Sequence, residues 1–138
     1  MPLKLSLKPG EKFAINGAVI VNSDRRSTLV VQNKASILRE RDIMQQEEVN
    51  SPARRIYFPI MMMYLDDAGH ARYYDEFSAR MSEFMEAVST PEILKLCVEI
   101  SKDVINGQFY AALRSCRQLI EFETELLGDE PASLSAHA

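Results

Sequence analysis

Two arginines separated by a single residue, Arg39 and Arg41, have the type and spacing that most directly suggest a chemical task in this sequence. They lie in a segment, 37–44, whose alternation predicts a strand with both arginines on one face. A guanidinium is planar and charged, so it can contact a phosphate or stack on an unpaired base. The alternative is a charged edge strand, in which Glu40 and Asp42 pair with the arginines.

Two further arginine pairs accompany the first. Arg25 and Arg26 fall in a polar turn where we expect a hairpin tip, and they are either solvated or secondary phosphate contacts. Arg54 and Arg55 follow Pro52 in what reads as the first turn of a helix, where positive charge opposes the helix dipole. Salt bridges to the acidic helices, or an extension of the basic face toward RNA, would each offset that cost.

Residue types that carry catalysis or bind metals are scattered in this chain. His70 and His137 are isolated, and Cys97 and Cys116 occupy helical core positions far apart in sequence. Neither a disulfide framework nor a metal site is expected from that spacing. The sequence also lacks a glycine-rich phosphate loop and a nucleophile elbow. We therefore expect no catalytic residues, no cofactor and no enzyme activity.

The basic residues are concentrated in a region, 1–50, that reads as a small antiparallel β module. Leucine alternates with lysine and serine over 3–8, which predicts a strand with one buried face. Asn16-Gly17 between two apolar runs favours a type I′ hairpin. Segments 28–32 and 37–44 supply further strands of a meander. Because so short a module makes a small core, it should dimerise or pack on the rest of the chain.

From residue 51 the apolar residues recur with the period of helices, which predicts a helical bundle over 51–128 and an α+β fold overall. Ser51-Pro52 and Thr90-Pro91 are typical helix starts. Pro59 would kink the first helix or shift its start, and an apolar strand is the alternative there. The expected helices cover about 52–65, 91–105 and 108–127, and a further one between the first two has one face marked by Phe77, Met81, Phe84, Met85 and Val88. The small, polar residues 129–138 are expected to be a disordered tail.

The first expected helix is apolar around nearly its whole circumference. A helix of this kind must be buried on several sides, so its large side chains belong to the core on the general rule. Methionine adapts to irregular surfaces, so a protein-binding or dimer face is the alternative. The residues of that candidate partner surface are Tyr57, Phe58, Met61 and Met62, with Arg54 and Arg55 beside them.

Composition and charge set the wider limits. The chain has 138 residues, of which 46% are hydrophobic and 26% charged, so wholesale disorder is excluded. No apolar run reaches the roughly 18 residues that span a bilayer, and the start does not read as a signal peptide. We expect a cytoplasmic protein with neither a membrane nor a DNA partner. The net charge of −4 divides into a basic front and an acidic back, which suggests different partners for the two parts.

Several segments, in order, carry a resemblance to a known family. They include Leu3-Lys4-Leu5-Ser6-Leu7-Lys8-Pro9-Gly10-Glu11, Gln32-Asn33-Lys34-Ala35-Ser36-Ile37-Leu38-Arg39-Glu40, Ser51-Pro52-Ala53-Arg54-Arg55-Ile56-Tyr57-Phe58 and Gly107-Gln108-Phe109-Tyr110-Ala111-Ala112-Leu113. Up to about Gly128 the chain resembles the FlbT family of flagellar regulators. The resemblance implies a cytoplasmic, non-enzymatic, post-transcriptional regulator that associates with the 5′ leader of flagellin mRNA and promotes its decay. It also makes FlaF and flagellin candidate protein partners, through a bundle whose last helix resembles that of flagellin export chaperones.

The first 44 residues are also similar to the small dimeric RNA-binding regulator CsrA. The similarity rests on the strand that ends in Gly10-Glu11, the hairpin, and Asn33 followed by Ile37-Leu38-Arg39-Glu40. In that family the first and last strands of an interlocked dimer contact RNA. The resemblance therefore implies a central role for Arg39, with Lys4, Ser6 and Lys8 on the adjoining strand. It also implies a homodimer. The paired arginines of that family's first strand are replaced here by Leu7-Lys8.

Overall fold

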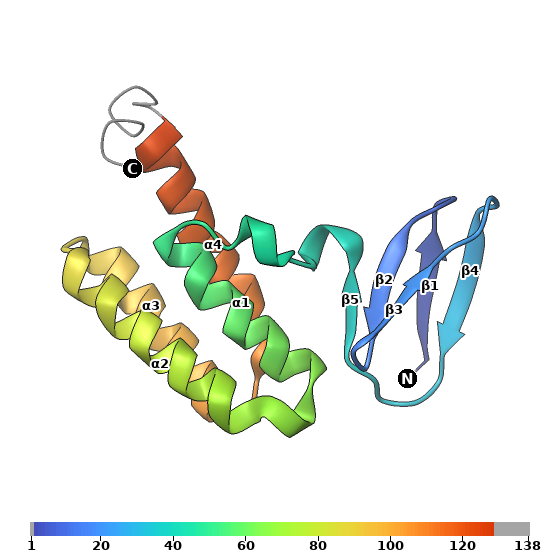
Figure 1. Ribbon diagram of the computed structural model, residues 1–138, viewed down its shortest axis with the longest axis horizontal. Helices are drawn as coiled ribbons and strands as arrows, with labels where there is room; N and C mark the ends of the chain where they lie inside the picture. The colour runs from blue at the N-terminus through green and yellow to red at the C-terminus, as the bar shows by residue number, and fades with distance from the viewer. Residues whose placement is uncertain (1, 129–138) are drawn as a thin grey trace.

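A computed structural model describes residues 2–128, and the expected tail at 129–138 lies outside this part. The chain folds as an α+β protein, with five short strands followed by four helices (Figure 1). The strands are β1 (Leu3–Leu7), β2 (Lys12–Ile15), β3 (Ala18–Val21), β4 (Ser27–Val31) and β5 (Ile37–Arg39). The helices are α1 (Pro52–Leu65), α2 (His70–Ala87), α3 (Pro91–Ile105) and α4 (Phe109–Gly128).

The strands form two small antiparallel sheets. β1 pairs with β4, and the second sheet has the order β3-β2-β5. The expected meander is therefore wrong outside the β2–β3 hairpin, because β3 and β4 are consecutive but lie in different sheets. The pairing of β1 with β4 sets Leu5 opposite Leu29, so the leucine face of β1 meets an apolar strand that is distant in sequence.

The hairpin between β2 and β3 is of the predicted kind. Asn16 and Gly17 both have positive φ, 51° and 89°, as a type I′ turn requires. The turn is also pressed against the end of α1, since a Cβ added to Gly17 would lie 3.0 Å from the carbonyl oxygen of Leu65. Glycine is needed at position 17 because the backbone has a positive φ and because the Leu65 carbonyl leaves no room for a side chain.

Strand β5 is shorter than the sequence predicted. It ends at Arg39, and Glu40–Asp42 form a 3₁₀ turn, so Arg39 and Arg41 do not share a strand face. The physical reason is a competing tertiary contact: the hydroxyl of Tyr57 donates to the carbonyl of Asp42 at 2.6 Å. The segment after β5 is thereby drawn onto the helices.

Helix α1 begins as predicted and continues past its internal proline. The Ser51 hydroxyl accepts the Arg54 backbone N–H at 3.3 Å, with Pro52 in the first turn. Pro59 leaves the Arg55 carbonyl without its helical donor, at a typical cost of about 3 kcal/mol. Full burial of Pro59 in the core offsets that cost, so the strand alternative and a shifted start are both wrong.

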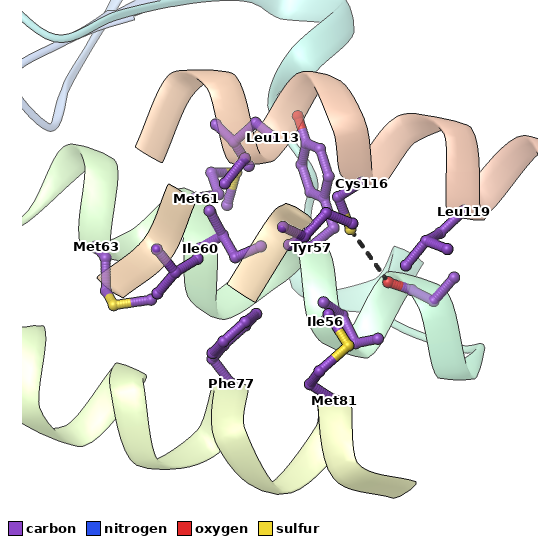
Figure 2. Close-up of a cluster of buried hydrophobic side chains, with 14 of the residues drawn as sticks. Ile56, Tyr57, Ile60, Met61, Met63, Phe77, Met81, Leu113, Cys116 and Leu119 are labelled. Carbon is purple, nitrogen blue, oxygen red and sulfur yellow. Dashed lines mark hydrogen bonds between the residues drawn. The ribbon is translucent and has the colours of Figure 1, made fainter. Parts of the chain in front are cut away.

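The main core lies around α1, which packs against α2 and α4. Figure 2 shows Ile56 and Ile60 of α1 between Phe77 and Met81 of α2 and side chains of α4. The sheet with β2 and β5 closes another side, because Ala14 and Leu38 belong to the same cluster. The α4 residues that complete the cluster include Leu113, Cys116 and Leu119.

Tyr64 joins β5 to α1 at the other end of the strand. Its hydroxyl accepts the N–H of Ile37 at 3.0 Å and donates to the carbonyl of the same residue at 3.1 Å. The β region is therefore attached to the helices by backbone hydrogen bonds as well as by apolar packing.

Candidate nucleic-acid interface

Two turns of the β region are held together at one end. The side-chain amide of Asn22 donates to the carbonyls of Lys8 and Arg25, each at 2.8 Å. The N–H of Gly10 donates to the Ser23 carbonyl at 2.9 Å. These contacts bring the segment after β1 beside the segment after β3, so lysine and arginine residues that are distant in sequence share one end of the β region.

Arg39 is fixed at this end by two acceptors. Its Nη2 donates to the Ser6 carbonyl at 2.6 Å and to the Glu11 carboxylate at 3.0 Å. The other carboxylate oxygen of Glu11 accepts the Lys8 backbone N–H at 2.9 Å. The Lys8 hydrogen bond, and then Arg39, lower the pKa of Glu11. Arg39 thus ties β5 to β1 while about a third of its side chain stays exposed.

Arg41 lies beside this contact, with 80% of its side chain exposed and its Nε 3.8 Å from the Asp42 carboxylate, so it forms a loose ion pair with its sequence neighbour. Together with Lys8 and Arg39 it lines a shallow hollow of about 710 Å³. Two carboxylates share the hollow, but Glu11 is engaged by Arg39, and Glu40 accepts the backbone N–H of Lys12 at 2.8 Å. The hollow therefore combines a positioned guanidinium, Arg39, with two exposed cationic side chains, Lys8 and Arg41.

The other expected RNA-binding residues surround this end. Lys4 and Ser6 lie on the exposed face of β1, because Leu5 and Leu7, which alternate with them, are buried. Arg25 and Arg26 are exposed, but they are not at a hairpin tip, since β3 and β4 lie in different sheets and do not pair with each other. They lie instead on the connection between the two sheets, which the Asn22 amide holds beside Lys8.

A third arginine of this region, Arg117 of α4, could not have been found from its sequence neighbours. It donates to the carbonyl of Arg41 at 3.2 Å and forms an ion pair with Asp42. Burial, and then the nearby Arg41, lower its pKa. A second hollow of about 220 Å³ lies here, with Arg41, Arg54 and Arg117 in its lining. Arg54 also donates to the Asn50 side chain at 3.3 Å.

The structure also accounts for the positive first turn of α1. The buried carboxylate of Glu123 accepts the backbone N–H of Ala53 at 3.0 Å, which places a negative charge at that helix N-terminus. Arg55 is exposed and lines an apolar hollow beside Glu123. The charge that offsets the two arginines therefore comes from α4.

The apolar residues considered as a partner surface lie mostly inside. Tyr57 and Met61 are buried in the core, and Phe58 and Met62 are partly buried against it. The reason is the central position of α1, which α2, α4 and β5 cover from different sides. Burial raises the pKa of the Tyr57 hydroxyl well above its usual range. Tyr57 and Met61 therefore present no surface to a partner in this conformation.

The cysteines are structural in character. Cys97 and Cys116 are buried and free, and burial raises the pKa of Cys97 to about 11. Over residues 2–128, no group of three potential ligands could hold a metal ion. In the same range, no helix is long and apolar enough to cross a membrane.

Taken together, a small β region with a basic exposed end and a helical bundle with an apolar core define a small two-part protein of the α+β class. The sequence model of the family described as "Flagellar protein FlbT" matches residues 3–127. The chain therefore belongs to the FlbT family.

Individual relatives agree with this assignment. The flagellum biosynthesis repressor protein FlbT of Caulobacter vibrioides is 57% identical over 136 residues, which cover 99% of this chain and 96% of the relative. The probable flagellum biosynthesis repressor FlbT of Caulobacter sp. strain K31 is 60% identical over 128 residues, with 93% and 98% covered. The corresponding protein of Brucella anthropi is 32% identical over 136 residues, with 99% and 89% covered. These names describe regulators rather than enzymes. No solved structure matches this chain.

Proposed function

We propose that this protein represses flagellum biosynthesis after transcription, by binding the 5′ leader of flagellin mRNA in the cytoplasm and promoting decay of that message. The names of its relatives support the repressor role. The observation that carries the RNA-binding role is the gathering of Lys8, Arg39 and Arg41 around one hollow of the β region. Cations that converge from separate segments suit a flexible polyanion.

The side chains divide into two roles in this proposal. Arg39, whose guanidinium is oriented by Ser6 and Glu11, offers a positioned plane for a base or a phosphate. Lys8 and Arg41 are exposed and contribute electrostatic contacts to phosphates. Lys4 and Ser6 on β1, and Arg25 and Arg26 on the connection between the sheets, would extend the contact to neighbouring nucleotides.

The test is a binding titration of the purified protein with the flagellin mRNA leader and with a scrambled RNA of equal length, each at two salt concentrations. We expect tighter binding to the leader and a steep loss of affinity as salt rises, because phosphate contacts release counterions. Equal or absent binding to both RNAs would contradict the proposal. The half-life of the message in cells with and without the protein tests the decay step.

A double variant, Lys8→Ala with Arg41→Ala, tests the site with little risk to the fold. Both side chains are exposed, whereas Arg39 braces two strands and its loss would disturb structure as well as binding. We expect the double variant to lower affinity for the leader about tenfold or more and to reduce the salt slope by roughly two. The matched control is Lys95→Ala with Lys102→Ala, which removes two exposed lysines from α3 and should leave binding unchanged.

A second candidate function is an adaptor that holds FlaF or flagellin on the helical bundle. The observation that favours it is a groove of about 460 Å³ between α3 and α4, where apolar side chains lie beside glutamates. Its acidic residues are Glu92, Glu99, Glu121 and Glu125. The test is co-purification of either protein with this chain. Loss of the partner in a Glu99→Lys/Glu121→Lys variant, with the partner retained in the control Glu76→Lys on α2, would support this function. Failure of both to co-purify would exclude it.

A further inference from the structure

An apolar hollow of about 280 Å³ lies where α1 begins and where α2 and α4 end. Figure 1 shows these three helix termini at the same end of the bundle. The apolar lining comes from Phe84 and Val88 of α2 and from Phe122 and Leu126 of α4. Leu126 still exposes 60% of its surface, so residues 2–128 leave this apolar surface open.

Arg80, which also lines the hollow, has an unused hydrogen-bond donor. Its Nη1 donates to Glu76 at 3.2 Å and its Nη2 donates to Glu83 at 2.9 Å, both on its own helix. Its Nε is buried and has no acceptor in the described part of the chain. Buried donors are almost always paired, so an acceptor is missing here. Because two carboxylates already balance the guanidinium charge, an uncharged acceptor such as a backbone carbonyl suits this position.

The other charged groups of the lining leave one cation for an occupant. Glu83 is engaged by Arg80, and Glu123 accepts the backbone N–H of Ala53 at 3.0 Å. Arg55, by contrast, is exposed and forms no ion pair with any residue from 2 to 128. The hollow therefore suits an apolar peptide that carries a carboxylate close to Arg55 and a free backbone carbonyl close to Arg80.

We propose that residues 129–134 of this chain dock in the hollow as an extended peptide. Helix α4 ends at Gly128, and Leu126 lines the hollow, so the segment begins beside the site. The segment has two carboxylates first and apolar side chains after them, in the sequence Asp129-Glu130-Pro131-Ala132-Ser133-Leu134. This order of charge and apolar surface is the one that the hollow suits.

The length of the segment is sufficient. Six extended residues reach at most about 20 Å, and packed helix axes lie about 8–10 Å apart. Since α4 packs against α1, and α1 against α2, the segment can reach all three helices that form the hollow. Its covalent attachment also gives an effective concentration in roughly the millimolar range, so weak contacts are enough for docking.

The chemistry of the segment matches the three features of the hollow. Its two carboxylates complement Arg55, and Pro131 and Leu134 supply the apolar side chains. Proline has no N–H that would need a partner in an apolar site, and the carbonyls beside it remain available to Arg80 Nε. A partner protein with a similar acidic and apolar peptide would have to displace this segment. The hollow shares no residue with the basic hollow of the β region, so this inference is independent of RNA binding.

The experiment is an intramolecular disulfide cross-link in the full chain. Ala87 is exposed and lines the hollow, and Ser133 lies between the two proposed apolar anchors without being one of them. With oxidised glutathione and about 1 μM protein, Ala87→Cys/Ser133→Cys should close about tenfold faster than Ser82→Cys/Ser133→Cys. Ser82 is the matched control because it is exposed on a different face of the same helix. The two native cysteines are buried, so they do not compete.

Three substitutions in the Ala87→Cys/Ser133→Cys protein test which contacts hold the segment. Leu134→Ser removes an apolar anchor and should slow closure to the rate of the control pair. Arg55→Glu repels the two carboxylates and should slow closure several-fold. Lys102→Glu removes an exposed cation of α3 that does not line the hollow, and it should leave the rate unchanged.

Equal closure rates of the two cysteine pairs would overturn the proposal, as would closure that responds to neither Leu134→Ser nor Arg55→Glu. Cross-links that join two chains, and that disappear on dilution, would assign the hollow to a second copy instead. A fluorescence measurement is independent of the cysteines, because the chain contains no tryptophan. Acrylamide should quench Leu134→Trp several-fold less than Ala138→Trp, and equal quenching of the two would also overturn the proposal.

Discussion

The carboxylate of Glu123 in α4 accepts the backbone N–H of Ala53 at the start of α1, at 3.0 Å, although 70 residues separate them. Glu123 is buried, and its charge lies where the helix dipole of α1 is positive and where Arg54 and Arg55 follow. One side chain therefore caps α1, joins it to α4 and offsets two arginines that would otherwise disfavour the first turn.

Removing this cap should destabilise the protein. Glu123→Ala leaves the Ala53 N–H buried without an acceptor, and the loss of a hydrogen bond to a charged group costs about 1.5–3 kcal/mol. Glu123→Gln keeps an acceptor and should lose less. Urea unfolding measures the stability of both variants, and Glu125→Gln, at an exposed position of the same helix, is the control. Equal stability of Glu123→Ala and the wild type would show that the cap contributes nothing.

The core around α1 should respond to truncation according to burial. Ile60 is fully buried between helices, and Ile60→Ala should lower the free energy of unfolding by about 2–5 kcal/mol through lost burial and a cavity. Ile105 is 68% exposed, so Ile105→Ala should change the free energy of unfolding by less than about 0.5 kcal/mol. Denaturant unfolding compares the two, and a similar loss in both would argue against the position of α1 at the centre of the core.

Alanine substitutions at two glycines distinguish the cost of an unfavourable backbone conformation from the cost of a steric clash. Gly17 and Gly107 both have positive φ, so alanine at either position costs roughly 1 kcal/mol from the backbone alone. At Gly17 the new Cβ would also lie 3.0 Å from the Leu65 carbonyl, whereas at Gly107 it meets nothing within 4 Å. We expect Gly17→Ala to lower the melting temperature more than Gly107→Ala. The reverse order would contradict the close approach of the hairpin to α1.

The Glu11–Arg39 pair should make the β region sensitive to acid. The pKa of Glu11 is lowered in the fold by the Lys8 N–H and by Arg39, so its ionised form favours the folded state. That contribution is complete above the ordinary glutamate pKa and disappears as the pH falls through the lowered folded value. Stability curves of the wild type and Glu11→Gln should therefore differ at neutral pH and converge in acid. If the stability difference between the wild type and Glu11→Gln stayed constant across pH, the Glu11–Arg39 pair would be excluded as the source of that difference.

Short-range chemistry in the sequence was enough to predict several elements. Asn16-Gly17 indicated its turn because those two residues tolerate positive φ, and the structure confirms it. Ser51-Pro52 marked the start of α1, because a serine cap and a proline in the first turn act within a few residues. The α+β division followed from the change in apolar period near residue 51, which reports which face of each element is buried.

Contacts between distant segments decided the rest. The pairing of β1 with β4, the end of β5 at Arg39 and the contact of Arg117 with Asp42 each depend on residues that no local pattern connects. The same holds for the cap from Glu123 and for the grouping of Lys8 with Arg39 and Arg41. Sequence alone determined which residues prefer turns, strands and helices, because those preferences act over a few residues. Only the tertiary structure decided which partners meet, because each candidate contact competes with others for the same buried surface and hydrogen bonds.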